Sequence, residues 1–326
     1  MGRGPPGDRE PDRPRGTLRD RTPNRRVASG QGLSVRPPNI PAPVAPDRAP
    51  VLRLPPGATD CHAHVFGPQS VHPLLPDTHF VPHETPWSAY ASMLRSVGCE
   101  RAVLVQPSVY GTDNGAIEEA LHAPGDIALR AVAVVAPGVS DAELERLHGL
   151  GFRGIRINLA SGTRGLGLDD ARTLAYRIRP LGWHLQFYAD FHRQPEIGEV
   201  LAALPVPVVV DHFGRVRAAD GVRSPGFQAL LRLLARDDRW VKLSAPYFIS
   251  DLFPGYDDVS AIARALVAAA PDRVVWGTDW PHASAREKMQ ADAELVDLLA
   301  HWMPDAGDRQ RVLVDNPARL YGFADA

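Results

Sequence analysis

Several residue types are scarce in this sequence, and each scarcity excludes a class of protein. Only two of the 326 residues are cysteine, Cys61 and Cys99, which is too few for the disulfide framework of a small secreted domain. Apolar runs such as 131–136 are far shorter than the roughly 20 residues of a membrane-spanning helix. The net charge of −2 provides no basic field that would attract nucleic acid. We therefore expect a cytoplasmic protein that binds neither nucleic acid nor a membrane.

Hydrophobic periodicity is missing from residues 1–50, which contain ten arginines, five acidic residues and eleven prolines. Such a segment cannot bury enough apolar surface to offset the entropy of ordering. Arg25 and Arg26 resemble a twin-arginine export signal, but no apolar stretch of about 7–15 residues follows them. We expect residues 1–50 to be a disordered extension and residues 51–326 to form one folded domain.

Short apolar segments alternate with longer amphipathic ones from residue 59 onward, and the apolar ones are typical of strands buried on both faces. The predicted strands cover 59–65, 101–106, 129–135, 154–158, 184–189, 206–212, 240–244 and 273–278. The predicted helices cover 86–97, 113–123, 140–149, 169–179, 194–203, 224–236, 257–270 and 286–302. This alternation, over about the 250 residues usual for the fold, predicts an α/β chain with a single (β/α)8 TIM barrel. No Gly-x-Gly-x-x-Gly follows the first strand, which disfavours a dinucleotide-binding sheet.

Four polar residues stand at the carboxyl ends of these strands, where barrel enzymes carry their chemistry. His62 and His64 are two residues apart on the first strand and therefore share a face. His212 follows the apolar run of the sixth strand, and Asp279 ends the eighth. The positions of these four side chains predict one acid/base or metal-binding cluster in the barrel mouth.

Other polar side chains at strand ends are candidates for binding substrate. Arg156 alternates with isoleucines on the fourth strand, so it requires an anion, either a substrate carboxylate or a structural acid. Tyr188 ends the fifth strand and Ser108 follows the second; each has a structural role as its alternative. Asp211 is expected to face away from His212 and to hold the following loop. His282, beyond the last strand, is a weaker candidate for the site.

Several motifs together resemble the amidohydrolase-2 branch of the amidohydrolase superfamily, in particular the 2-pyrone-4,6-dicarboxylate lactonase-like TIM-barrel hydrolases. The resemblance runs from about residue 59 to 323, and the motifs lie at 59–66, 106–114, 153–156, 211–214, 276–282 and 316–321. It implies catalytic roles for His62, His64, His212 and Asp279, and substrate contacts for Ser108, Arg156 and Tyr188.

The sequence departs from that family in its arginines. The arginine expected after the fourth strand matches Arg164 only with a shifted loop, and the arginine expected after the seventh strand is replaced by Phe248. A tyrosine usual after the first strand is replaced by Phe80. We therefore expect a lactone less charged than the pyrone dicarboxylate, with a carboxylate on Arg156. Phe80, Tyr247 and Phe248 are expected to form walls of the pocket, on loops 73–86 and 247–258.

The expected reaction is hydrolysis of a carboxylic ester bond in a lactone, with Asp279 as general base. The histidine cluster then either stabilises the oxyanion or, with Asp279, holds one divalent metal ion, most naturally zinc; both alternatives are open. Because Arg156 occupies the fourth strand and neither Lys242 nor Lys288 lies there, a two-metal centre bridged by a carboxylated lysine is excluded. The alternative activity is a metal-dependent decarboxylase of the same branch, acting on an aromatic or muconate-type acid.

Overall fold

Eight parallel strands, paired in chain order from the first to the last, form the centre of the protein. The structure is a computed structural model that describes residues 1–2, 37–160 and 165–324, and its compact unit spans Pro37–Ala326. The strands are β1 (Thr59–Ala63), β2 (Arg101–Val105), β3 (Ala128–Ala133), β4 (Phe152–Asn158), β5 (His184–Tyr188), β6 (Val208–Val210), β7 (Arg239–Leu243) and β8 (Val274–Trp276). The predicted (β/α)8 barrel is confirmed.

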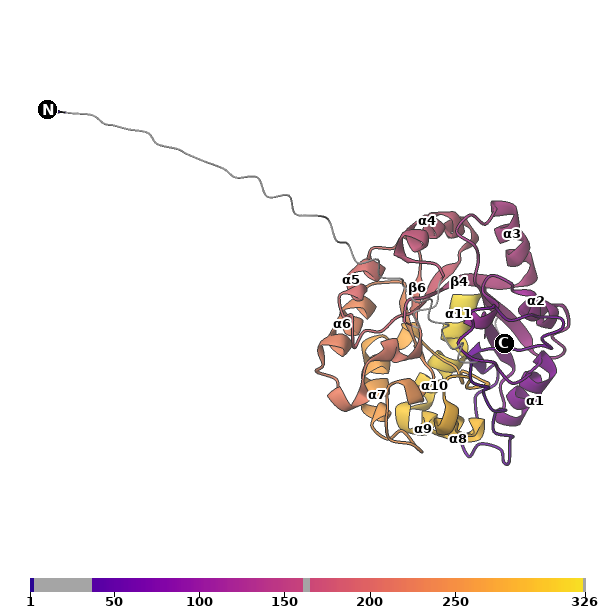
Figure 1. The fold of residues 1–326 in the computed structure, drawn as a ribbon. Helices are drawn as coiled ribbons and strands as arrows, with labels where there is room; N and C mark the ends of the chain where they lie inside the picture. The colour runs from indigo at the N-terminus through magenta and orange to yellow at the C-terminus, as the bar shows by residue number, and fades with distance from the viewer. Residues whose placement is uncertain (3–36, 161–164, 325–326) are drawn as a thin grey trace, which may run out of the picture. The chain divides into compact units, whose positions relative to one another are not determined.

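Helices surround this sheet in chain order, as the colours of Figure 1 show, except the last one, which lies near the centre of that view. They are α1 (Trp87–Val97), α2 (Gly115–His122), α3 (Asp141–Leu150), α4 (Leu168–Ile178), α5 (Ile197–Ala202), α6 (Pro225–Leu234), α7 (Val259–Ala269), α8 (Asp292–Asp297), α9 (Leu299–Trp302), α10 (Ala306–Gln310) and α11 (Asn316–Tyr321). Short 3-10 turns are η1 (Ser108–Tyr110), η2 (Arg179–Leu181), η3 (His212–Arg215), η4 (Ala218–Asp220), η5 (Pro246–Phe248), η6 (Pro271–Arg273) and η7 (Arg286–Lys288), and η8 (Arg311–Asp315) is a π-helical turn. None of the helices among the described residues is long and apolar enough to cross a membrane.

The alternation of side chains along each strand divides the apolar core into two layers. On β2, Ala102 and Leu104 pack outward against the helices, whereas Val103 and Val105 point into the barrel. Tyr321 and Phe323, from α11 and the residues after it, belong to the inner layer. The barrel interior is therefore a packed core, and residues that follow several of the strands line a cavity at its mouth.

Two predicted boundaries differ from the structure. The helix expected at 286–302 is divided into the turn η7 and the helices α8 and α9, and α8 begins only at Asp292. Residues 37–50, assigned above to the extension, lie in the compact unit. Ile40 is buried there, and its N–H donates to the carbonyl of Val81 over 2.8 Å.

Candidate active site

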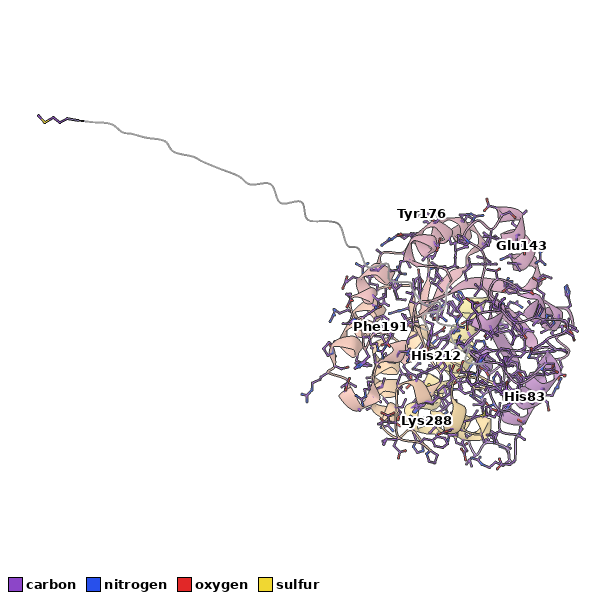
Figure 2. The ribbon with its side chains drawn as sticks, viewed as in Figure 1. His83, Glu143, Tyr176, Phe191, His212 and Lys288 are labelled. Carbon is purple, nitrogen blue, oxygen red and sulfur yellow. The ribbon has the colours of Figure 1, made fainter. Side chains whose placement is uncertain are left out.

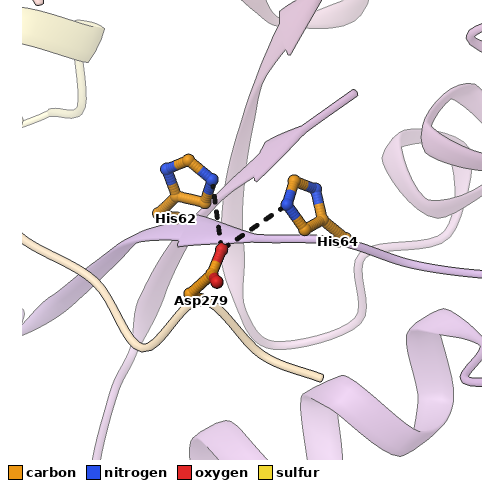
Figure 3. Close-up of side chains that lie close together, drawn as sticks. All are labelled: His62, His64 and Asp279. Atoms are coloured by element: carbon orange, nitrogen blue, oxygen red, sulfur yellow. Dashed lines mark ion pairs between the residues drawn. The ribbon is translucent and has the colours of Figure 1, made fainter. Parts of the chain in front are cut away.

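The four residues expected to form the cluster converge at the carboxyl ends of β1, β6 and β8. Nε2 of His62 and Nε2 of His64 lie 3.4 Å and 3.5 Å from Oδ1 of Asp279. Figure 3 shows this carboxylate facing both rings. Nε2 of His212 lies 3.9 Å from the same oxygen, and His212 occupies the interior of the molecule in Figure 2. Three imidazoles thus surround one carboxylate oxygen.

The junction between β1 and β8 positions two of these residues through the main chain. The N–H of Asp279 donates to the carbonyl of His62 over 2.8 Å, and the N–H of His64 donates to the carbonyl of Trp280 over 2.7 Å. Beneath them, Asp60 accepts hydrogen bonds from the N–H and hydroxyl of Thr278. Burial raises the pKa of Asp60 to about 6 in spite of these bonds. These main-chain hydrogen bonds hold Asp279 next to His62 and His64.

Two of the imidazoles are held by partners on their outer nitrogens. Nδ1 of His64 lies 2.7 Å from the carbonyl oxygen of Val105. Because a carbonyl only accepts, Nδ1 carries a hydrogen, and Nε2 presents its lone pair in the tautomer that has no second N–H. Nδ1 of His212 lies 2.8 Å from the hydroxyl of Ser244. Such outer partners are typical of histidines that bind metals.

The donor set fits one divalent cation. One nitrogen each of His62 and His64 and a carboxylate oxygen of Asp279 all lie within 4.8 Å of one another, and the three residues are buried. Nε2 of His62 is buried without a hydrogen-bond partner among the described residues. A positive charge between them would stabilise nitrogen lone pairs that face a carboxylate, and two imidazoles plus a carboxylate are a usual ligand set for catalytic zinc.

Burial and mutual attraction set the charges in this cluster. Burial, the largest effect, lowers the pKa of His62 well below its ordinary value and that of His212 to about 4. Both rings are therefore neutral near pH 7, as metal binding requires. Burial alone would raise the pKa of Asp279, but the surrounding imidazoles of His212, His64 and His62 hold it below its ordinary value. Asp279 is thus ionised and able to accept a proton.

A cavity of about 80 Å³ opens directly above the cluster. Its lining includes eight of the predicted site residues: His64, Phe80, Ser108, Arg156, Tyr188, His212, Phe248 and Asp279. His62 lies fully buried behind this lining. Arg164 lies outside the described residues. His282 does not face the cavity, because its Nε2 pairs with Asp292 at 3.1 Å.

Arg156 contacts a structural acid, one of the two alternatives predicted from the sequence; binding of a substrate carboxylate stays a prediction. Its Nε lies 3.4 Å from Oδ2 of Asp211, and its Nη1 donates to the carbonyl of Gln106 over 3.2 Å. It also lines the cavity. The expectation that Asp211 faces away from His212 is wrong. Asp211 is fully buried, with Oδ1 3.3 Å from Nδ1 of His62. The cause is the backbone, since Asp211 is still extended whereas His212 has a φ of 50°, in the left-handed region, so strand alternation breaks between these two residues.

Aromatic rings form one wall of the cavity. The ring centroid of Phe248 lies 5.1 Å from that of His212 and 5.7 Å from that of Tyr188. The guanidinium of Arg215 lies over Phe248, 4.9 Å from its centroid, and donates to the hydroxyl of Tyr188. The hydroxyl of Tyr247 donates to Oδ2 of Asp279, so Tyr247 contacts this carboxylate directly.

Sequence reasoning missed three of these contacts. Arg215 and Tyr247 lie in turns after strands, where no periodicity indicates which way a side chain points. Lys242 is buried under the cluster on β7, with Nζ 3.4 Å from Nδ1 of His62. An isolated lysine between Val241 and Leu243 of an apolar strand is the signal that would have identified it.

Comparison with known proteins gives consistent matches across the barrel. A family model described as amidohydrolase matches residues 59–323. A 2-pyrone-4,6-dicarboxylate hydrolase of Comamonas testosteroni is 39% identical over 282 residues, covering 83% of this chain and 92% of the relative. A 4-sulfomuconolactone hydrolase of Hydrogenophaga intermedia is 35% identical, covering 82% and 90%. The crystal structure of a 2-pyrone-4,6-dicarboxylic acid hydrolase, described as putative, from Pseudomonas putida has a TM-score of 0.72 and 32% identity, and the match covers 84% of this chain and all of that one.

Proposed function

The chain belongs to the amidohydrolase family, and from this premise we propose that it is a hydrolase that opens a lactone, a cyclic ester, by attack of water. One observation carries the proposal: His62, His64 and His212 meet at one oxygen of Asp279, directly below a cavity. The reaction class is supported by the two hydrolases described above, whose names specify lactone substrates.

We propose that His62, His64 and Asp279 hold one divalent cation, with His212 as a further ligand or a donor to substrate. The lone pair that His64 presents toward Asp279 supports this choice over a cluster without metal, because a neutral His64 in that tautomer has no hydrogen to give to an oxyanion. When bound, such a cation polarises the ester carbonyl and lowers the pKa of water to about 7.

Asp279 is the general base in this proposal. Its carboxylate accepts the proton of the attacking water and later gives it to the ring oxygen that leaves when the ester C–O bond breaks. One lactone and one water thus give one hydroxy acid, whose carboxyl group releases one proton near pH 7. Tyr247 holds Oδ2 of Asp279, so Oδ1 is the oxygen presented to the imidazoles.

The substrate proposed is a lactone that carries at least one carboxylate. Arg156 reaches the cavity and binds this group, because a guanidinium matches a carboxylate in shape and charge. Ser108 and Tyr188 contribute hydroxyl groups, and Phe80 and Phe248 enclose the ring. The two relatives' named substrates, a pyrone dicarboxylate and a sulfonated muconolactone, are likewise anionic.

An assay of acid release on carboxylated lactones tests the proposal. We expect one proton per ring opened, no carbon dioxide, and a loss of about 10²–10⁴-fold in kcat for Asp279→Asn. Asp126→Asn, an exposed partner of Arg95 far from the site, is the matched control and should retain full activity. Release of carbon dioxide would establish the decarboxylase instead, and turnover by Asp279→Asn within a few-fold of the unmodified protein would contradict the role of Asp279.

A further inference from the structure

A buried ammonium group lies beneath the three imidazoles, and the proposed hydrolysis does not use it. Lys242 is fully buried on β7. Its Nζ donates to the carbonyl of Cys61 and to Oε1 of Gln186, each over 2.8 Å. The same Nζ lies 3.4 Å from Nδ1 of His62. A buried charge is costly unless it is paired, so its place under the site requires an explanation.

Asp211 provides the opposite charge on the same ring nitrogen. Oδ1 of Asp211 lies 3.3 Å from Nδ1 of His62 and 3.7 Å from Nζ of Lys242. Gln186 joins the two charged groups, because its Nε2 donates to Oδ2 of Asp211 over 3.1 Å while its Oε1 accepts from Lys242. These contacts fix the orientation of the amide and hold both charges beside His62.

Nδ1 of His62 therefore has a hydrogen-bond acceptor on one side and a donor on the other. A neutral imidazole carries one N–H. If Nδ1 carries it and donates to Asp211, Nε2 presents a lone pair toward Asp279. If Lys242 donates to Nδ1 instead, the hydrogen is on Nε2, which then faces Oδ1 of Asp279 at 3.4 Å as a donor. A cation ligand requires the first tautomer.

We propose that Asp211 and Lys242 are positioning residues that select the tautomer of His62: Asp211 favours the form that binds a cation, and Lys242 favours the form that donates to Asp279 when the cation is absent. The inference rests on the cation site of the proposed function. It adds that the site has two hydrogen-bond arrangements around His62, one with the cation bound and one without it.

The two charges should then act on zinc affinity in opposite directions. Asp211→Asn removes the acceptor charge, and we expect zinc to bind about 10–100-fold more weakly, the usual cost of losing such a partner. Lys242→Met removes the competing donor and a like charge, so zinc should bind at least as tightly as to the unmodified protein. Damage to the fold alone would weaken binding in both variants. Equal losses in the two, or an Asp211→Asn affinity within twofold of normal, would overturn the proposal.

Histidine ¹⁵N NMR on the metal-free full chain tests the tautomer without zinc or substrate. The signals of His62 are assigned from their absence in His62→Gln. We expect the hydrogen on Nε2 in the unmodified protein and on Nδ1 in Lys242→Met. The same tautomer in both would overturn the proposed role of Lys242. This readout does not depend on lactone hydrolysis, so failure of the lactone assay and failure of this inference are distinguishable.

Two further variants separate charge from folding. Lys242→Gln is neutral and keeps an N–H that can reach the carbonyl of Cys61, so it tests the same prediction if Lys242→Met does not fold. Lys288→Met removes the only other lysine of the chain, which pairs with Asp251 at the surface. Its zinc affinity and His62 tautomer should be unchanged; a change as large as in Lys242→Met would mean that net charge, not position, is responsible, and would overturn the inference.

Discussion

The hydroxyl of Tyr247 donates a hydrogen bond to Oδ2 of Asp279, the oxygen that does not face the histidines. Burial raises the pKa of Tyr247 well above its ordinary value, so the phenol remains a donor at any pH at which the protein is assayed. Tyr247 comes from η5, after β7, and therefore connects the aromatic wall of the cavity to Asp279, which follows β8.

Replacing Tyr247 by Phe should lower kcat by about 10–100-fold with little change in KM, because a hydrogen bond to a charged group contributes about 1.5–3 kcal/mol. The substrate keeps its contacts, and only the orientation of Asp279 changes. Steady-state kinetics on a carboxylated lactone measure both constants. Tyr176→Phe, which alters an exposed phenol on α4, is the control. A kcat within twofold of normal would show that Asp279 is oriented without Tyr247.

Arg156→Lys separates the two partners of Arg156. Lysine retains one charge for Asp211 but loses the planar pair of donors that fits a carboxylate. We expect KM for a carboxylated lactone to rise about tenfold or more, and KM for an uncharged lactone to remain nearly constant. Equal losses on both substrates would instead mean that Arg156 acts only through its contact with Asp211.

Phe248→Arg should shift preference toward dianionic lactones. The ring of Phe248 lies against Tyr188 and His212 at the wall of the cavity, and Arg215 already stands 4.9 Å from it. Two guanidinium groups so close repel unless an anion lies between them. The ratio of kcat/KM for a dianionic and a monoanionic lactone should increase at least tenfold. Phe248→Leu, which removes the ring without adding charge, should leave the ratio unchanged, and an unchanged ratio in Phe248→Arg would refute the idea.

Stability should fall in mildly acidic solution because histidines are buried in neutral form. Burial, with a smaller effect from the charge of Lys242, lowers the pKa of His184 to about 3. The unfolded chain binds a proton there near pH 6.5, so the stability present above that pH is lost as pH falls toward 3. Urea unfolding of metal-free protein between pH 6.5 and 4 should show this loss.

His184→Gln isolates that contribution. Removing one such histidine should reduce the dependence of the unfolding free energy on pH by up to one proton, about 1.4 kcal/mol per pH unit. His301→Gln, at an exposed position on α9, should leave the slope unchanged. If both variants unfold with the slope of the unmodified protein, the neutral His184 does not contribute to acid sensitivity.

The sequence was sufficient to predict the barrel and the convergence of four residues. Runs such as 206–210 are typical of strands buried on both faces, and parallel strands of one barrel bring their carboxyl ends to one mouth. His62, His64, His212 and Asp279 were therefore placed together by topology alone, without knowledge of any distance.

Directions beyond strand ends could not be predicted, because side-chain alternation requires extended backbone. His212, Phe213 and Asp279 have φ values of 50°, 54° and 66°, in the left-handed region that breaks the alternation. Asp211 was assigned to the wrong side for this reason. The contacts of Tyr247 and Arg215 likewise depend on turn geometry. The inward direction of Lys242 could have been predicted from strand alternation, since Trp240, two residues earlier, belongs to the inner layer.

The hydrogen bonds between β1 and the residues after β8 have a consequence for biosynthesis. His62 and Asp279 are separated by 217 positions along the chain, yet the main chain of one bonds directly to that of the other. During translation the histidines emerge long before the carboxylate, so a partial chain ending before residue 279 has neither this carboxylate nor the main-chain hydrogen bonds that hold it. A ligand that contacts both β1 and the residues after β8 stabilises the folded barrel by its binding free energy. An incomplete chain gains no such stabilisation.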